Sequence, residues 1–197
     1  MRLLIMGPPG AGKGTQAGAI ADHYNIVTLS TGQLFRDNIQ LGTPLGRRIE
    51  SLIAAGNLVP DEITNEMVFS RLDTPDVRKR GGYLLDGYPR TLEQAQAFDQ
   101  ELVSTRSKLD AVVALTADPH ALIQRMLKRA EIEGRADDNE QSIRHRIDVY
   151  RAETQELLDL YRDRGLLVEV DAVGAVDDVR QRITRSLDAK LGPRRRR

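Results

Sequence analysis

The sequence predicts an α/β fold of three layers, in which a central five-stranded parallel sheet is covered by helices on both faces. Short apolar runs alternate with helical patterns along the chain, as strand–helix–strand units require. A glycine-rich turn joins the first apolar run to the first helical pattern. With 197 residues, the chain is long enough to form one domain with a substantial core.

Five short runs are the predicted strands, and a helix is expected over residues 15–22, directly after the glycine-rich turn. Strands that are buried on both faces of a sheet are continuously apolar rather than alternating. Four of the five runs have this character. The runs cover residues 2–6, 27–29, 83–86, 111–115 and 167–170.

The crossover between the second and third predicted strands contains about fifty residues of helical pattern. Its segments are residues 31–40, 45–55 and 61–72, separated by Gly42-Thr-Pro44, by Gly56-Asn57 and by Val59-Pro60. Asp61 and Glu62 lie at the start of the third segment, where the helix dipole favours acidic residues. A crossover of this length predicts a helical subdomain above the sheet.

A second irregular stretch, residues 131–138, separates a predicted helix over 119–130 from a long one over 139–164. It is polar and contains one glycine. A short lid over an active site and an ordinary connector have this same composition, so both interpretations stay open at this point.

Residues 7–15, Gly-Pro-Pro-Gly-Ala-Gly-Lys-Gly-Thr, form the glycine-rich turn. Between a strand and a helix, such a turn directs backbone N–H groups at phosphate oxygens, and the lysine adds a cation. The spacing of Gly7, Gly12 and Lys13 fits the phosphate-loop pattern. That pattern places a hydroxyl directly after the lysine, whereas here Gly14 intervenes and the hydroxyl comes at Thr15. The turn predicts a nucleotide bound through its phosphates.

A dinucleotide-binding pattern competes with this interpretation, because Gly12-Lys-Gly14-Thr-Gln-Ala17 fits GxGxxA. That pattern needs an acidic residue after the second strand to hold a ribose. The second predicted strand is followed by Ser30-Thr31-Gly32 and no carboxylate, which favours the phosphate loop.

Asp86 ends the third predicted strand, at the edge of the sheet where ligands of open α/β folds collect. Its carboxylate is a candidate to hold Mg²⁺, directly or through water. The alternative is that Asp86 caps the turn at Gly87.

Arginines recur at helix and loop positions around this edge, and guanidinium groups match phosphate oxygens in shape and charge. Taken singly, each arginine is more typical of a surface ion pair, for which Asp137, Asp138 and Glu140 are available. Several of them around one phosphate loop favour contacts with phosphate. Catalytic nucleophiles are not evident, since His23, His120 and His145 fall on predicted helices without paired carboxylates. The arginines are Arg36, Arg90, Arg125, Arg129, Arg135 and Arg146.

Composition narrows the classes of protein. The chain has 29 basic and 29 acidic residues, so its net charge predicts neither a nucleic-acid nor a membrane partner. It has no cysteine, which excludes disulfides and thiolate zinc sites and suits a reducing, cytoplasmic location. We expect no membrane span and no signal peptide. The basic run 194–197 is expected to be a frayed, solvated tail.

Four motifs in order resemble the adenylate kinase family, and the resemblance covers nearly the whole chain. They are the Gly7-to-Thr15 loop, Ser30-Thr31-Gly32-x-Leu34-x-Arg36, Asp86-Gly87-Tyr88-Pro89-Arg90 with Gln94, and Gly134-Arg135-Ala-Asp-Asp138 with Arg146. The resemblance implies a phosphate-loop NTPase fold with a core of residues 1–29, 73–129 and 140–192. It further implies an AMP-binding insert at about 30–59, a short lid at about 130–139, and one domain over 1–197 with the tail 193–197 outside the fold.

The resemblance also implies roles for individual residues. Lys13, Arg90, Arg129, Arg135 and Arg146 would be catalytic, and Asp86 would hold Mg²⁺ through water. ATP would be bound by Gly10, Ala11, Gly12, Lys13, Gly14, Thr15, Arg129 and Gly174. AMP would be bound by Thr31, Arg36, Asn57, Leu58, Val59, Gly87, Tyr88, Pro89, Arg90, Gln94, Arg135 and Arg146. The family's zinc-bearing long lid is not expected.

The implied reaction is Mg²⁺-dependent transfer of a phosphoryl group between ATP and AMP, giving two ADP, by a monomer. Related uridylate–cytidylate kinases carry Ala and Asn where Thr31 and Gln94 stand, so this pair favours AMP. A UMP or CMP kinase, a phosphate-loop ATPase and a dinucleotide-dependent oxidoreductase are the alternatives.

Overall fold

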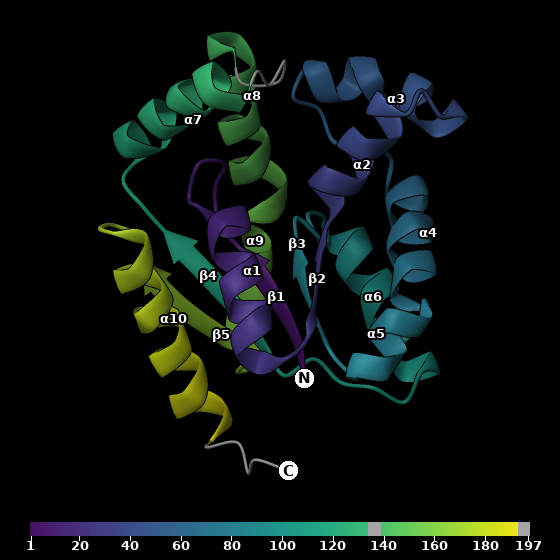
Figure 1. Ribbon diagram of the computed structural model, residues 1–197, viewed down its shortest axis with the longest axis vertical. Coiled ribbons are helices and arrows are strands. Elements are labelled where there is room, and N and C mark those ends of the chain that lie inside the picture. Colours follow the sequence, from purple (N-terminus) through teal and green to yellow (C-terminus); the bar gives the residue numbers. More distant parts are fainter. Residues whose placement is uncertain (134–138, 193–197) are drawn as a thin grey trace.

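The computed structural model describes residues 1–133 and 139–192. Its centre is a parallel five-stranded sheet in the order β2-β3-β1-β4-β5 (Figure 1). The predicted fold class is therefore confirmed. The strands are β1 (Arg2–Met6), β2 (Val27–Ser30), β3 (Tyr83–Asp86), β4 (Ala111–Thr116) and β5 (Leu167–Asp171).

Helices follow each strand and fill the long crossover. Before β3 lie α1 (Lys13–Tyr24), α2 (Thr31–Gln40), α3 (Pro44–Ala54), α4 (Asp61–Leu72) and α5 (Pro75–Arg80). After β3 lie α6 (Leu92–Ser104), α7 (Pro119–Glu133), α8 (Glu140–Val149), α9 (Glu156–Asp163) and α10 (Val176–Leu191).

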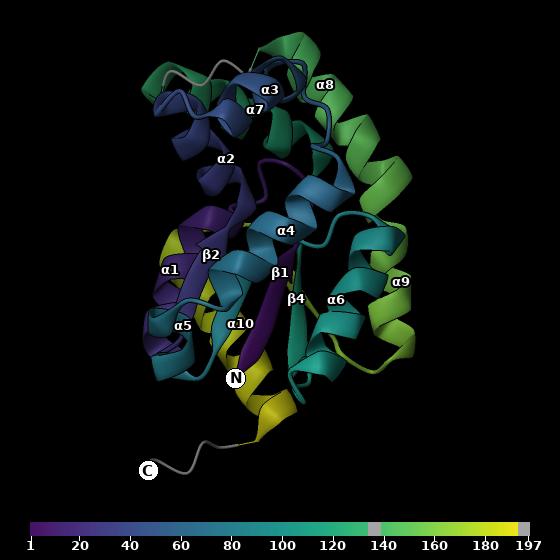
Figure 2. The same ribbon diagram turned by 90° about the vertical axis from the view of Figure 1, so that its right-hand side faces the viewer.

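The alternation of side chains along β1 divides the core into two clusters, one on each face of the sheet. Leu3 and Ile5 pack with α1, α7 and α10, whereas Leu4 and Met6 pack with α4, α6 and α9. Figure 2 shows α1 and α10 on one side of the strands, with α6 and α9 on the other. The three predicted layers follow from this division.

Hydrogen bonds join α1 to α10 at both ends of α1. Near its start, the Gln16 amide nitrogen donates to the Val176 carbonyl at 2.9 Å. At its end, the Tyr24 hydroxyl donates to Asp188 Oδ1 at 2.8 Å. The helix that begins in the phosphate loop is thus fixed against the last helix of the described chain.

The strand order creates a crevice between the carboxyl ends of β1 and β3. These strands are neighbours, with Ile5 opposite Asp86, yet the helices that follow them cover opposite faces of the sheet. Ligands of open α/β sheets bind at such a switch point. The phosphate loop follows β1 and Asp86 ends β3, so both predicted motifs meet there.

Two helical arms stand above the carboxyl ends of the strands, α2 with α3 on one side and α7 with α8 on the other (Figure 1). The arm of α2 and α3 has a small apolar cluster of its own, built around Phe35, Ile49 and Val59. It corresponds to the segment predicted as an insert in the long crossover.

Two predicted helices differ from the observed ones. The helix predicted over 119–130 continues to Glu133, because Glu131 and Ile132 are compatible with a helix despite the polar composition of the stretch. The predicted irregular stretch 131–138 was therefore wrong in its first three residues. Residues 134–138 lie outside the described chain.

The long helix predicted over 139–164 is divided by a π-helical turn, η2 (Tyr150–Thr154). There the Gln155 N–H donates to the Tyr150 carbonyl, one residue further back than in an α-helix. The prediction of one uninterrupted helix was wrong at this turn. Across the described ranges, none of the helices combines the length and apolar character that crossing a membrane requires.

Candidate active site

The phosphate loop closes around the start of α1. Gly10 and Gly12 have φ angles of +82° and +87°, which residues with a side chain rarely adopt. Gly12 precedes the first turn of α1 and has no side chain that could cap it. The N–H groups of this turn are therefore available to an anion, as phosphate binding at a helix N-terminus requires.

Lys13 folds back over the loop that precedes it. Its Nζ donates to the carbonyls of Gly7 at 2.7 Å and of Pro8 at 3.1 Å. The pKa of Lys13 is lowered from 10.5 to about 8. Burial of the ammonium is the largest cause, Asp86 opposes it, and Arg90, Arg146 and Arg129 contribute to the lowering. The site therefore holds an excess of positive charge.

Five cationic side chains line one groove at the switch point, although they come from five separate segments. Lys13 begins α1, Arg36 lies on α2, Arg90 follows β3, and Arg129 and Arg146 lie on α7 and α8. Asp86 is the acidic residue in this lining. The arrangement suits several phosphate groups held close together.

Asp86 lies against the phosphate loop. Its Oδ2 is 3.7 Å from the position that a Cβ on Gly14 would occupy. No group of three or more potential metal-ligating side chains occurs in residues 1–133 or 139–192. A single carboxylate beside a phosphate site fits Mg²⁺, which uses one or two carboxylates, phosphate oxygens and water.

One pocket opens on the α7 and α10 side of the loop. It contains Gly10, Ala11, Gly12, Thr15, Arg129 and Gly174, all of which were predicted to bind ATP. Arg125 also lines it, and its guanidinium donates to the Ala172 carbonyl at 3.1 Å. Arg125 thereby ties α7 to the segment after β5.

A second pocket lies between the insert and the segment after β3. It brings together most of the residues predicted to bind AMP: Thr31, Arg36, Asn57, Leu58, Val59, Gly87, Arg90, Gln94 and Arg146. The Thr31 hydroxyl donates to the Gly87 carbonyl at 2.9 Å, so its lone pairs are left to accept a hydrogen bond from a ligand.

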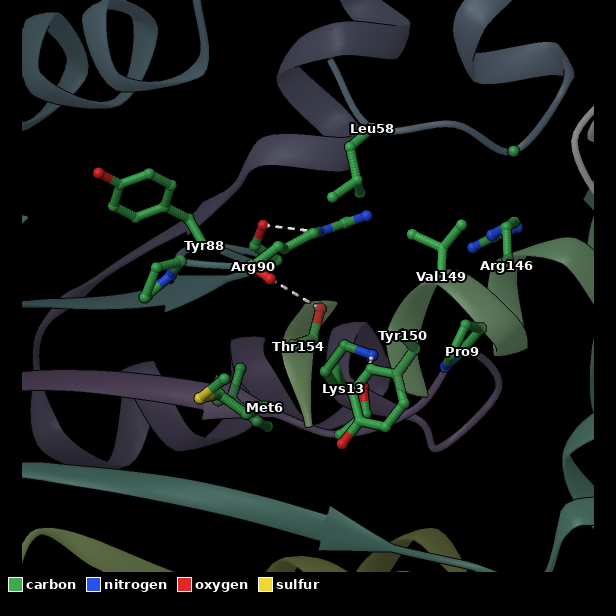
Figure 3. A pocket seen from close by; sticks show the side chains of 15 residues that line it. Met6, Pro9, Lys13, Leu58, Tyr88, Arg90, Arg146, Val149, Tyr150 and Thr154 are labelled. Atoms are coloured by element: carbon green, nitrogen blue, oxygen red, sulfur yellow. Dashed lines mark hydrogen bonds between the residues drawn. The ribbon is translucent and has the colours of Figure 1, made fainter. Parts of the chain in front are cut away.

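A small pocket between Lys13 and Arg90 connects this region to η2 (Figure 3). Thr154 donates its hydroxyl proton to the Arg90 carbonyl at 3.0 Å, and the Arg90 Nε donates to the Gly87 carbonyl at 2.9 Å. Tyr88 and Pro89 line this pocket, and the ring of Tyr88 points away from Lys13. The Tyr88 hydroxyl donates to Asn65 Oδ1 at 2.6 Å. Arg135 lies outside the described residues.

The insert touches α8 through Ser142 and His145, two residues to which the sequence assigned no functional role. The Ser142 hydroxyl donates to the Ala54 carbonyl at 2.9 Å, and His145 Nε2 is 2.7 Å from Asn57 Oδ1. Gly56 has a φ of +82°, and a Cβ there would lie 2.9 Å from Arg146 Cγ. Gly56 was the sequence feature that could have indicated this close contact between the insert and α8. The sequence alone marks it only as a break between two predicted helices.

The three-layer fold and the cation-lined groove at its switch point define a phosphate-loop nucleotide-binding protein. A family model described as adenylate kinase matches residues 5–166. An adenylate kinase from Nocardioides sp. is 52% identical over 188 residues, which are 95% of this chain and 97% of that protein. An adenylate kinase from Clavibacter michiganensis subsp. michiganensis is 53% identical over 94% of this chain and 92% of its own length. One from Thermobifida fusca is 47% identical over 96% of this chain and 100% of its own length.

The chain therefore belongs to the adenylate kinase family, and it is a phosphotransferase. The family predicted from four motifs is confirmed.

Proposed function

We propose that the protein transfers a phosphoryl group reversibly between ATP and AMP in the groove of Lys13, Arg36, Arg90, Arg129 and Arg146. Membership of the adenylate kinase family implies this reaction. The five cationic side chains meet in one groove between two separate pockets. This observation is the main support for giving these residues their roles in the reaction. Two nucleotides that meet end to end would place their phosphates there.

The pocket between α7 and α10 is the proposed ATP site. The loop N–H groups and Lys13 would hold the β- and γ-phosphates, and Arg129 would lie along the phosphate chain. The adenine would lie against the segment at Gly174. Thr15 and Asp86 would hold Mg²⁺ with its water, and the metal would supply positive charge that stabilises the charge developing on the phosphates.

The pocket between the insert and β3 is the proposed AMP site. Arg36 and Arg90 would bind the AMP phosphate, while Thr31 and Gln94 would face the base. The Thr31 hydroxyl donates its own proton to the Gly87 carbonyl, so its lone pairs could accept a hydrogen bond from the 6-amino group of adenine. Arg146 lines both this pocket and the central groove, so it could follow the transferred group as negative charge develops.

Catalysis here consists of alignment and charge stabilisation, because phosphoryl transfer needs little covalent participation from the protein. We propose that residues 30–59 form the moving AMP subdomain and that residues 130–139, with Arg135, form a short lid. Closure of both would exclude water, so that AMP rather than water receives the phosphoryl group.

We further propose that the protein is a cytoplasmic monomer without partners other than its nucleotides. Equal numbers of acidic and basic residues argue against a nucleic-acid or membrane partner, and the lack of cysteine suits a reducing cytoplasm. The monomer is proposed from the family alone. Light scattering of the purified protein measures the mass, and a dimer would contradict the monomer.

A coupled assay with AMP, UMP, CMP and GMP as acceptors tests the proposed function. We expect AMP to be preferred at saturating ATP and Mg²⁺. A preference for UMP or CMP would overturn the assignment of the acceptor. Rapid ADP release without any monophosphate would instead indicate an ATPase.

A further inference from the structure

The amide of Gln94 is held from both of its ends. Its Nε2 donates to Asp61 Oδ1 at 2.6 Å, and its Oε1 accepts from the Arg90 backbone N–H at 2.8 Å. Gln94 is buried, with 2% of its surface exposed, and it lines the proposed AMP pocket. Asp61 lies outside that pocket, at the first position of α4.

We infer that Asp61 fixes which way round the Gln94 amide lies, and that it thereby makes this pocket select adenine. An ionised carboxylate can only accept hydrogen bonds, and a backbone N–H can only donate one. The amide therefore has one orientation that satisfies both neighbours. In the flipped orientation, the Gln94 oxygen would face the Asp61 carboxylate and its NH₂ group would face the Arg90 N–H.

This orientation decides what Gln94 can offer a base. After the two contacts are made, one N–H of Nε2 and one lone pair of Oε1 remain. The Watson–Crick edge of adenine presents an acceptor, N1, beside a donor, the 6-amino group, and so complements them. Hypoxanthine presents the opposite pattern, an N1–H donor beside a carbonyl oxygen, and would need the flipped amide. This inference rests on the proposed AMP site.

Asp61 is itself held in place, which makes it an effective anchor. The Thr91 hydroxyl donates to Asp61 Oδ2 at 2.7 Å and accepts from the Gln94 backbone N–H at 3.1 Å. Thr91 is buried, and it caps the start of α6. Asp61 is thus a positioning residue that acts on the base through Gln94.

The variant Asp61→Asn tests the inference with little change in shape. An asparagine can turn either its oxygen or its NH₂ group toward Gln94, so position 61 no longer opposes the flipped amide, and only the Arg90 N–H still disfavours it. We expect the ratio of the inhibition constant of inosine monophosphate to the KM of AMP to fall about tenfold, which corresponds to one hydrogen bond to a charged group. The kcat at saturating AMP and the KM of ATP should stay close to wild type.

Glu62→Gln is the matched control, because Glu62 is the exposed next residue in the first turn of α4. The Glu62→Gln variant loses the same charge as Asp61→Asn without changing a contact of Gln94. Its ratio of the inhibition constant of inosine monophosphate to the KM of AMP should therefore equal that of wild type. Asp61→Ala removes the anchor altogether, and we expect it to raise the KM of AMP by about tenfold. Circular dichroism establishes that each variant is folded.

An unchanged ratio in Asp61→Asn would overturn the inference, even if both nucleotides bound less tightly, because a general loosening affects them equally. Should Asp61→Ala fail to fold, the Asp61→Asn ratio still decides. The proposed function fails separately, if wild-type protein does not use AMP as an acceptor.

Discussion

Lys13 shows how one residue can couple nucleotide binding to pH. Its ammonium rests on carbonyls of its own loop, and burial lowers its pKa to about 8. A phosphate group placed beside it would favour the charged form and raise the pKa again. Binding of ATP should therefore be accompanied by uptake of a proton when the pH lies near or above 8.

The affinity for ATP is expected to fall as the pH rises through about 8 toward about 10. Calorimetric titrations in buffers of different ionisation enthalpy measure the proton uptake directly. In Lys13→Arg, whose guanidinium stays charged, the uptake should disappear. Proton uptake equal to that of wild type in this variant would contradict the role given to Lys13.

The same pKa affects folding with a definite sign. Between pH 8 and pH 10.5, Lys13 is protonated in the unfolded chain and largely neutral in the folded one. Because the unfolded state binds more protons, this residue makes the free energy of unfolding rise with pH over that window.

Lys13→Met should abolish phosphoryl transfer while leaving the protein folded. The substitution removes the cation from the groove but keeps the apolar stem, and at pH 7 it relieves the burial of a charge. Turnover and urea denaturation together check this expectation. Near-normal turnover in this variant would show that Lys13 is not a catalytic residue.

At the scale of elements, the contact between the insert and α8 positions Arg146. Gly56 allows the two to approach, because its φ is positive and a Cβ there would lie 2.9 Å from Arg146 Cγ and 3.2 Å from the Ser142 carbonyl oxygen. The hydrogen bond from Ser142 to Ala54 holds the same contact. Movement of the insert would therefore change the surroundings of an arginine on another arm.

Gly56→Ala is expected to destabilise the fold by about 1–3 kcal/mol and to lower kcat, because the methyl group would separate the insert from α8. Urea denaturation and steady-state kinetics measure the two effects. Gly165→Ala is the matched control for backbone strain, since Gly165 has a φ of +66° and no atom within 4 Å of its Cβ position. An equal loss of kcat in both variants would mean that contact with Arg146 is not the cause.

At the scale of the whole molecule, the five strands were predictable because their signal is local. Short runs after recognisable turns, four of them continuously apolar, predicted all five positions to within one residue at each end. The phosphate loop and Asp86 were predictable as neighbours, since both follow strands at one edge of the sheet. Their chemistry was thus readable from residue type and position.

The features that stayed unpredicted depend on contacts between distant segments. The π-helical turn has no local signal such as proline or glycine, and it lies where Thr154 meets the Arg90 carbonyl, 64 residues away. Asp61 had a sufficient local explanation as an acidic residue at a helix start. Its contact with Gln94, 33 residues further on, exists only in the folded chain.

AMP should stabilise the entire fold, because its proposed pocket joins the insert to the sheet. At an AMP concentration about 100 times its dissociation constant, the free energy of unfolding should rise by about 2.7 kcal/mol. Urea denaturation with and without AMP measures this gain, and NAD is the control for a dinucleotide site. Stabilisation by NAD and not by AMP would contradict the proposed AMP site and favour a dinucleotide-binding site instead.

The bonds between α1 and α10 have a consequence for synthesis on the ribosome. The phosphate loop emerges more than 150 residues before one wall of its pocket, which is formed by Val176 and Val179. Until about residue 191 has left the exit tunnel, the face of the sheet that Ile183 and Leu187 will cover stays bare. We expect the nascent chain to acquire its ATP pocket only after α10 has emerged, which leaves a long interval in which chaperones can bind that apolar face.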